Sequence, residues 1–269
     1  MVRLSYLIAM LPFDAAVYDL DGTLLDSRKR ISVRTRRALE AAREAGLHAI
    51  FATARPPRDI RHLGLEEFGA QVYYNGAMAH CARAGLAWSE SLSPDLTGRI
   101  LDFLGASGGS SLVSVEIEDR WLTHQDGDHA SRFKAADAPL RVLREEITAR
   151  GCSKILVQDC PDYEALRSEF GPWCAILRTD AGELIQIMAR TATKENAVAA
   201  FCTHNGWRLD RVLCFGDDFN DLGLFRACGH PVAMGNAIPE LKAIAREVAL
   251  AHDEDGVAIV LERILSEGH

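Results

Sequence analysis

Two pairs of carboxylates directly follow apolar runs that are typical of buried strands. Asp19 and Asp21 follow such a run in "VYDLDGTLLD", and Asp217 and Asp221 follow another in "RVLCFGDDFND". In an open parallel sheet the carboxyl ends of the strands form the ligand-binding edge, so we expect these side chains to converge there. Carboxylates from separate strands repel each other unless a divalent cation lies between them. The hard oxygen ligands favour magnesium, which often binds phosphate as well.

Two further polar residues at predicted element ends indicate a phosphoryl group as the partner. Thr53 ends the apolar run "HAIFAT", and Lys194 opens a predicted helix after Thr193. A carboxylate can attack phosphorus, a second carboxyl group can transfer protons, and fixed positive charge can stabilise the phosphoryl oxygens. Considered singly, Thr53 is more typical of a strand end and Lys194 of a solvated helix. Both assignments therefore depend on the order of all four segments.

The elements that must position these residues alternate between strands and helices at both ends of the chain. Strands are expected at residues 13–20, 48–53 and 71–74, and helices at residues 32–47 and 56–68. Ser32 is the expected N-cap of the first helix and Gly46 its stop. From about Thr193 the alternation resumes and ends in a helix that begins near Gly256. This pattern predicts an α/β fold, with a Rossmann-like, doubly wound parallel-sheet core covered by helices on both faces.

The middle of the chain has a different pattern. Two hairpins are expected, one turning near Gly85 and one near Asp119. Helices expected over residues 94–106 and 139–151 alternate with three further strands. We interpret residues 81–189 as an α+β cap domain inserted into the core, which then consists of residues 1–80 and 190–269. Single-sequence patterns fix such boundaries only to within several residues.

The overall composition narrows the class of partner and the location. The chain has 269 residues, is 48% hydrophobic and carries a net charge of −8, which argues against nucleic acid as the partner and favours a small molecule. Its seven scattered cysteines form no C-x-x-C pair, as expected for reduced thiols in the cytoplasm. No apolar run is long enough to cross a membrane. Residues 4–13 are apolar but short, and Met10 is an alternative start.

The quoted motifs resemble, in order, the four motifs of the haloacid dehalogenase-like (HAD) hydrolases. The matching segments are "DLDGTLL", Thr53 in "ATARP", Lys194 in "TKENAV", and "GDDFND". Three further segments, "YYNGA", "VAMGNAIPELK" and "DEDGVA", resemble more narrowly the Cof-type phosphatases, which have an α/β (type IIB) cap after the third core strand. The resemblance covers both core segments, whereas the cap matches mainly in size and position.

This resemblance implies a role for each matching residue. Asp19 would be the nucleophile that forms an aspartyl-phosphate, and Asp21 the general acid and then the general base. Thr53 and Lys194 would hold the phosphoryl oxygens. Mg²⁺ would be held by the Asp19 carboxylate, the Asp21 backbone carbonyl and Asp217, with Asp221 close by, directly or through water. The expected substrate-binding residues are Gly22, Thr23, Ala54, Arg55, Asn75 and Asn220.

The sequence departs from the family pattern at two positions. Ala54 and Glu195 stand where glycines are common, and Glu195 adds negative charge beside Lys194. Neither change removes a catalytic group. The expected function is hydrolysis of a small phosphorylated metabolite, such as a sugar phosphate, by a magnesium-dependent phosphatase. A phosphomutase of the same superfamily and a non-catalytic sensor of a phosphorylated ligand are the alternatives. The sequence identifies neither the substrate nor the oligomeric state.

Overall fold

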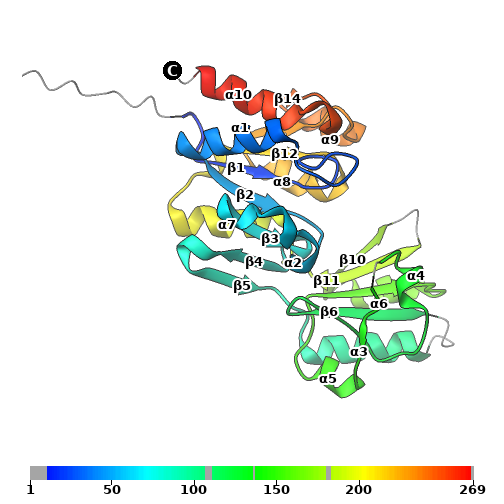
Figure 1. The fold of residues 1–269 in the computed structure, drawn as a ribbon. Helices are drawn as coiled ribbons and strands as arrows, with labels where there is room; N and C mark the ends of the chain where they lie inside the picture. The colour runs from blue at the N-terminus through cyan, green and yellow to red at the C-terminus, as the bar shows by residue number, and fades with distance from the viewer. Residues whose placement is uncertain (1–10, 107–110, 136, 180–182, 268–269) are drawn as a thin grey trace, which may run out of the picture.

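The computed structural model describes residues 11–106, 111–135, 137–179 and 183–267, so Met10 lies outside the described residues. An eight-stranded sheet has the order β14-β13-β12-β1-β2-β3-β4-β5 (Figure 1). The six strands from β14 to β3 are parallel to one another. Strand β4 is antiparallel to β3, and β5 is antiparallel to β4. The strands are β1 (Ala15–Tyr18), β2 (His48–Ala52), β3 (Gly69–Tyr73), β4 (Met78–Cys81), β5 (Leu86–Ser89), β12 (Val212–Gly216), β13 (His230–Ala233) and β14 (Glu247–Val248).

Helices cover both faces of this sheet, as predicted. They are α1 (Val33–Glu44), α2 (Pro57–Ile60), α7 (Lys194–Asn205), α8 (Leu222–Ala227), α9 (Pro239–Ile244) and α10 (Gly256–Glu267). Helix α1 packs against α10, whereas α7 packs against α8, which in turn packs against α9. The sheet grows in opposite directions from β1, and right-handed crossovers therefore place α1 and α8 on opposite faces. The predicted doubly wound core is confirmed.

The central strand β1 is apolar throughout because both of its faces are covered. All four of its residues are buried, and the Tyr18 ring stacks with Phe51 of β2 and Phe215 of β12, each at a centroid distance of 5.4 Å. The Ser32 hydroxyl accepts a hydrogen bond from the Thr35 N–H and caps α1 as predicted. These contacts fix the strand whose carboxyl end carries Asp19.

Two predicted helices are shorter than expected. The helix predicted over residues 56–68 is α2 followed by two single turns of 3-10 helix, separated at Gly64, which has a left-handed φ of 65°. The segment 139–151 contains the short strand β8 (Leu140–Arg141) before helix α5 (Arg144–Thr148). In both segments the apolar spacing is helical, but a local turn or a strand pairing interrupts the helix.

The middle of the chain forms a second sheet with the order β10-β11-β9-β6-β7-β8. Its other strands are β6 (Leu112–Ile117), β7 (Arg120–Thr123), β9 (Lys154–Gln158), β10 (Cys174–Thr179) and β11 (Leu184–Ala189). Its other helices are α3 (Pro94–Ala106), α4 (His129–Arg132) and α6 (Tyr163–Phe170). The buried apolar residues form two separate clusters, one around each sheet. Figure 1 shows this second α+β unit, the cap, beside the core.

The first hairpin differs from the prediction. A boundary at residue 81 would separate β4 from β5, yet both strands belong to the core sheet: β4 pairs with β3, and β5 pairs with β4. The hairpin expected in the cap therefore extends the core sheet, because the open edge of β3 offers unpaired backbone groups to an antiparallel neighbour. The other predicted domain limits remain predictions. Among the described residues, no helix has both the length and the hydrophobicity needed to span a membrane.

An ion pair with a buried carboxylate joins the cap to the core. The guanidinium of Arg58, on α2, donates to both oxygens of Glu116 on β6, at 2.6 and 2.8 Å. Glu116 is buried, and it also accepts a hydrogen bond from the Tyr74 hydroxyl at 3.1 Å. The neighbouring pair of Arg61 and Asp119 is 2.8 Å long, but the Arg61 side chain is mostly exposed.

Arg58→Met should lower the free energy of unfolding by about 2 kcal/mol, because it leaves the buried Glu116 carboxylate without its cationic partner. The matched variant Arg61→Met removes an arginine whose side chain is mostly exposed and should change that free energy by less than about 0.5 kcal/mol. Urea unfolding of both variants measures the difference. Equal losses in the two variants would show that the Arg58 pair does not stabilise the junction.

Candidate active site

Three neighbouring strands of the core end at the same edge of the sheet with a polar residue. Asp19 directly follows β1, Thr53 follows β2 and Asp217 follows β12. The two flanking strands lie on either side of β1 and run parallel to it. The sheet extends in both directions from β1. Ligands of open α/β sheets bind at the carboxyl end of such a strand. The predicted convergence of these segments is present.

Helix α7 brings Lys194 to this edge. The Lys194 side chain is fully buried, and its ammonium lies 2.5 Å from Asp19 Oδ1 and 2.7 Å from Asp221 Oδ1. The start of α7 is held by its N-cap Thr193, whose backbone packs closely on Gly76. A Cβ at Gly76, which has a φ of 111°, would lie 2.2 Å from the Thr193 carbonyl oxygen. The glycine therefore allows the close approach that places Lys194.

The two other carboxylates at this edge have different surroundings. Asp221 is completely buried, and its second oxygen accepts hydrogen bonds from the backbone N–H groups of Asp217 and Asp218. Both oxygens of Asp221 thus have protein partners. Asp217 is only partly buried and accepts a hydrogen bond from the Thr23 hydroxyl at 3.1 Å. A Cβ at Gly22 would lie 2.2 Å from the Asp217 carboxylate, so this position requires glycine.

The shared ammonium shapes the electrostatics of the site. Burial and the nearby Asp221 and Asp217 raise the pKa of Asp19, although Lys194 opposes this shift. Burial alone would lower the pKa of Lys194, but Asp19 and Asp221 outweigh it and keep the lysine protonated. Burial, followed by the charge of Asp221, raises the pKa of Asp217 to about 6. When all four groups are ionised, two negative charges remain uncompensated.

These charges and ligand atoms fit a divalent metal ion. One carboxylate oxygen from each of Asp19, Asp217 and Asp221 lies within 4.8 Å of the others. The donors are hard oxygens, and a divalent cation would balance the two remaining charges. Asp217 has the best access, because it is only partly buried whereas Asp221 is completely buried. The predicted contribution of the Asp21 backbone carbonyl remains a prediction.

Asp21 has a cationic environment that the sequence analysis did not anticipate. Its carboxylate accepts hydrogen bonds from Arg55 Nε and Nη2 at 2.6 and 2.5 Å, and from Lys29 Nζ at 2.6 Å. Burial acts to raise the pKa of Asp21, but these two cations outweigh it and leave the pKa below its usual range. Arg55, predicted as a substrate contact, is therefore bound to the predicted proton donor in this structure.

Thr53, predicted as a catalytic residue, and the remaining predicted substrate residues lie in the loops after β2, β3 and β12. Thr53 is buried, and its hydroxyl accepts the Arg55 backbone N–H at 3.1 Å. Asn75, with a left-handed φ of 56°, accepts a hydrogen bond from the Asn220 amide at 3.1 Å, which links the loops after β3 and β12. The Ala54 carbonyl accepts a hydrogen bond from a cap residue, Lys154, at 3.1 Å.

Several residues at the site were not singled out from the sequence. Lys154 lies on cap strand β9, where no motif marked it. Asn236, within the quoted "VAMGNAIPELK" segment, donates to the Gly22 carbonyl at 2.8 Å and supports the loop after β1.

The Glu195 carboxylate lies against Gly223 of α8, where a Cβ would be 2.3 Å from it. That close contact identifies a packing partner for the unusual Glu195.

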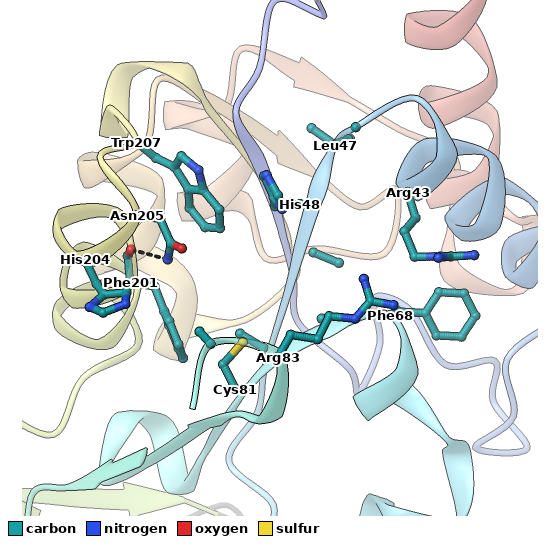
Figure 2. A pocket seen from close by; sticks show the side chains of 15 residues that line it. Arg43, Leu47, His48, Phe68, Cys81, Arg83, Phe201, His204, Asn205 and Trp207 are labelled. Carbon is teal, nitrogen blue, oxygen red and sulfur yellow. Dashed lines mark hydrogen bonds between the residues drawn. The ribbon is translucent and has the colours of Figure 1, made fainter. Parts of the chain in front are cut away.

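A separate cavity of about 460 Å³ lies at the opposite end of the parallel strands (Figure 2). It is lined by residues such as His48 at the start of β2 and His204 near the end of α7, whereas Thr53 and Lys194 occupy the other ends of these segments. None of the carboxylates described above lines it. This cavity is therefore distinct from the acidic site.

The comparisons with known proteins agree with this geometry. The family model of haloacid dehalogenase-like hydrolases matches residues 16–261, so the chain belongs to this family. A putative phosphatase of Haemophilus influenzae is 28% identical over 95% of this chain and 99% of its own length. A 5-amino-6-(5-phospho-D-ribitylamino)uracil phosphatase of Bacillus subtilis is 27% identical over 97% of this chain and 98% of its own length.

A solved structure described as a HAD subclass IIB sugar phosphatase has the same fold. It superposes with a TM-score of 0.78 at 23% sequence identity and covers 93% of this chain and 98% of its own. The predicted resemblance to the HAD family, including its type IIB cap, is thereby confirmed, and the chain is a hydrolase of that family.

Asp217→Asn should stabilise the metal-free protein at pH 7 by about 1 to 2 kcal/mol, because the neutral amide avoids the cost of ionising the Asp217 carboxyl group in the folded protein. Solvent screening of this partly buried group keeps the expected gain small. Between about pH 4 and pH 6 the folded protein keeps a proton on Asp217 that the unfolded chain has lost, so wild-type stability falls as pH rises. The stability of Asp217→Asn does not fall over this pH range. The two proteins should therefore have the same free energy of unfolding near pH 4.

Urea unfolding in a chelator, repeated with excess Mg²⁺, measures both effects. Added metal should stabilise the wild type and reverse the order of the two proteins at pH 7, because only the wild type keeps the third carboxylate. Equal stabilisation of both proteins by Mg²⁺ would contradict a metal site at Asp217.

Proposed function

We propose that the chain is a magnesium-dependent phosphatase that hydrolyses a small phosphorylated metabolite through an aspartyl-phosphate on Asp19. The observation that carries this proposal is the buried Lys194 ammonium, which contacts Asp19 at 2.5 Å and Asp221 at 2.7 Å while Asp217 completes the acidic cluster. A buried carboxylate, a fixed cation and a metal-binding acidic cluster are the groups that phosphoryl transfer requires.

In the first step, one Asp19 oxygen attacks phosphorus and the bond from phosphorus to the ester oxygen breaks. Asp21 gives its proton to the departing alkoxide. In the second step, the Asp21 carboxylate takes a proton from water, which attacks phosphorus and breaks its bond to Asp19. Lys194 and Thr53 hold the phosphoryl oxygens throughout. Bound Mg²⁺ would neutralise the charge that develops on these oxygens.

The contact between Arg55 and Asp21 must change during this cycle. While Arg55 is paired with Asp21, the pKa of Asp21 lies too low for efficient protonation of an alkoxide. A dianionic phosphoryl group entering the site would compete for the Arg55 guanidinium, because arginine binds phosphate and carboxylate with the same bidentate geometry. Substrate binding would thereby release Asp21 and raise its pKa when a proton donor is needed.

Two observations support a small metabolite as the partner. The chain has a net charge of −8, and its relatives carry phosphatase names that specify small phosphorylated compounds, including the ribitylaminouracil phosphatase of Bacillus subtilis.

Phosphate release from a panel of phosphorylated metabolites tests the proposed activity. The wild type should release phosphate only with Mg²⁺, and Asp19→Asn should lower kcat by at least about 1,000-fold because the amide cannot replace the nucleophile. Release at equal rates by both proteins would exclude Asp19 as the nucleophile. Isomerised product from a sugar bisphosphate would indicate a mutase, and tight binding without turnover would indicate a sensor.

Arg55→Gln should move the alkaline limb of the kcat/KM profile to higher pH. Removal of one cation raises the pKa of Asp21, so its protonated form persists at higher pH. Arg28→Gln, at an exposed position in the segment between β1 and α1 that carries Asp21, is the matched control and should leave the limb in place. A limb at the same pH in all three proteins would mean that Asp21 is not the proton donor.

A further inference from the structure

A second cavity lies between the core and the cap, next to the acidic site. It has a volume of about 560 Å³, within the range of small-molecule pockets. Arg55, Arg58 and Tyr74 line its core side, whereas Trp121, Phe133 and Lys154 line its cap side. Arg55 connects it to the chemistry, since its guanidinium also contacts Asp21, the proposed proton donor to the leaving group.

Aromatic side chains form a fixed wall on the cap side of this cavity. The rings of Trp121 and Phe133 meet edge to face at a centroid distance of 5.8 Å and an angle of 87°. The Trp121 indole N–H donates to the Ser114 hydroxyl at 2.8 Å, and Phe133 stacks on His129 at 6.0 Å. Both rings are therefore held in place by neighbours within the cap. A wall of this kind favours a flat apolar surface on the ligand.

The deep polar groups of the cavity are donors rather than acceptors. Glu116 is its buried carboxylate, and both of its oxygens are occupied by Arg58, one of them also by Tyr74. The other carboxylates of the lining, Asp59 and Asp137, lie at its exposed rim. A polyol needs an acceptor for each of its hydroxyl hydrogens, and the one buried carboxylate, which already accepts three hydrogen bonds, offers few.

Lys154 is the buried donor that remains. Its ammonium donates to the Ala54 carbonyl at 3.1 Å and to Gln186 Oε1 at 3.0 Å, and it lies 5.5 Å from the centroid of the Tyr74 ring. An ammonium has three N–H donors, so these two acceptors leave one N–H for a ligand. Burial lowers the pKa of Lys154 to about 8, which keeps the group mostly protonated at neutral pH.

We propose that the substrate's leaving group is a flat heteroaromatic alcohol, whose ring lies against Trp121 and Phe133 and accepts a hydrogen bond from Lys154. This inference rests on the proposed phosphatase function, since it describes the alcohol that departs from phosphorus. This leaving group differs from that of the sugar phosphate expected from the sequence, because a cavity with few free acceptors and an aromatic wall matches a ring with acceptors better than a polyol.

Four phosphate esters test this inference: pyridylmethyl, benzyl and cyclohexylmethyl phosphate, and a hexose monophosphate. Their Kd values are measured calorimetrically with Asp19→Asn, which binds without turnover, and their kcat/KM values with the wild type. The pyridyl ester should exceed the benzyl ester by at least about tenfold, because only its ring accepts a hydrogen bond. The benzyl ester should in turn exceed the two non-aromatic esters.

Variants assign each preference to its residues. Lys154→Met should remove the advantage of pyridyl over benzyl, whereas Trp121→Leu should remove the advantage of benzyl over cyclohexylmethyl. Lys134→Met, at an exposed lysine on the same cavity rim, is the matched control and should preserve both ratios. A preserved pyridyl advantage in Lys154→Met would overturn the role of this lysine.

The two proposals can fail separately. Equal binding of all four esters, or preference for the hexose phosphate, would overturn the heteroaromatic leaving group even if every ester were hydrolysed. The predicted binding order without any phosphate release would support the leaving group and contradict the phosphatase. A uniform loss of affinity for all four esters in Lys154→Met would show that this residue only supports the structure.

Discussion

The rest of the site depends on the ion pairs that the Lys194 ammonium makes with the carboxylates of Asp19 and Asp221. Three carboxylates gathered at one sheet edge would repel each other strongly in a buried environment. One buried cation offsets part of this repulsion, and the remaining charge suits a divalent metal ion. The same arrangement keeps Asp19 desolvated and close to a positive group, which are the conditions that a carboxylate needs to attack a phosphate dianion.

The fold serves to place this lysine and these carboxylates. Parallel strands β12, β1 and β2 bring Asp217, Asp19 and Thr53 to one edge, and α7 points its first residue toward the same edge. Glycines at positions 22 and 76 allow the close approaches of Asp217 and Thr193 that side chains would prevent. The cap also contacts this edge, since Lys154 donates a hydrogen bond to the carbonyl of Ala54, which lies between Thr53 and Arg55.

Much of the core was predictable from the sequence because Asp19, Thr53 and Asp217 directly follow apolar strands and Lys194 opens a helix. The pairing of Arg55 with Asp21 was not predictable, since it depends on the side-chain direction of a loop residue. Lys154 carried no local signal, because its role arises from the packing of β9 on a core loop distant in sequence. The hairpin of β4 and β5 was assigned to the cap because strand pairing across an insertion boundary leaves no periodic pattern.

Chemical trapping of the covalent intermediate tests the central claim most directly. The enzyme is quenched during turnover with Mg²⁺ and treated with borohydride, which reduces an aspartyl-phosphate to homoserine, and the peptide containing residue 19 is then analysed by mass spectrometry. The account predicts homoserine at position 19 in the wild type and none in a sample quenched without substrate. Reduction at another carboxylate, or unmodified Asp19 during a burst of phosphate release, would contradict it.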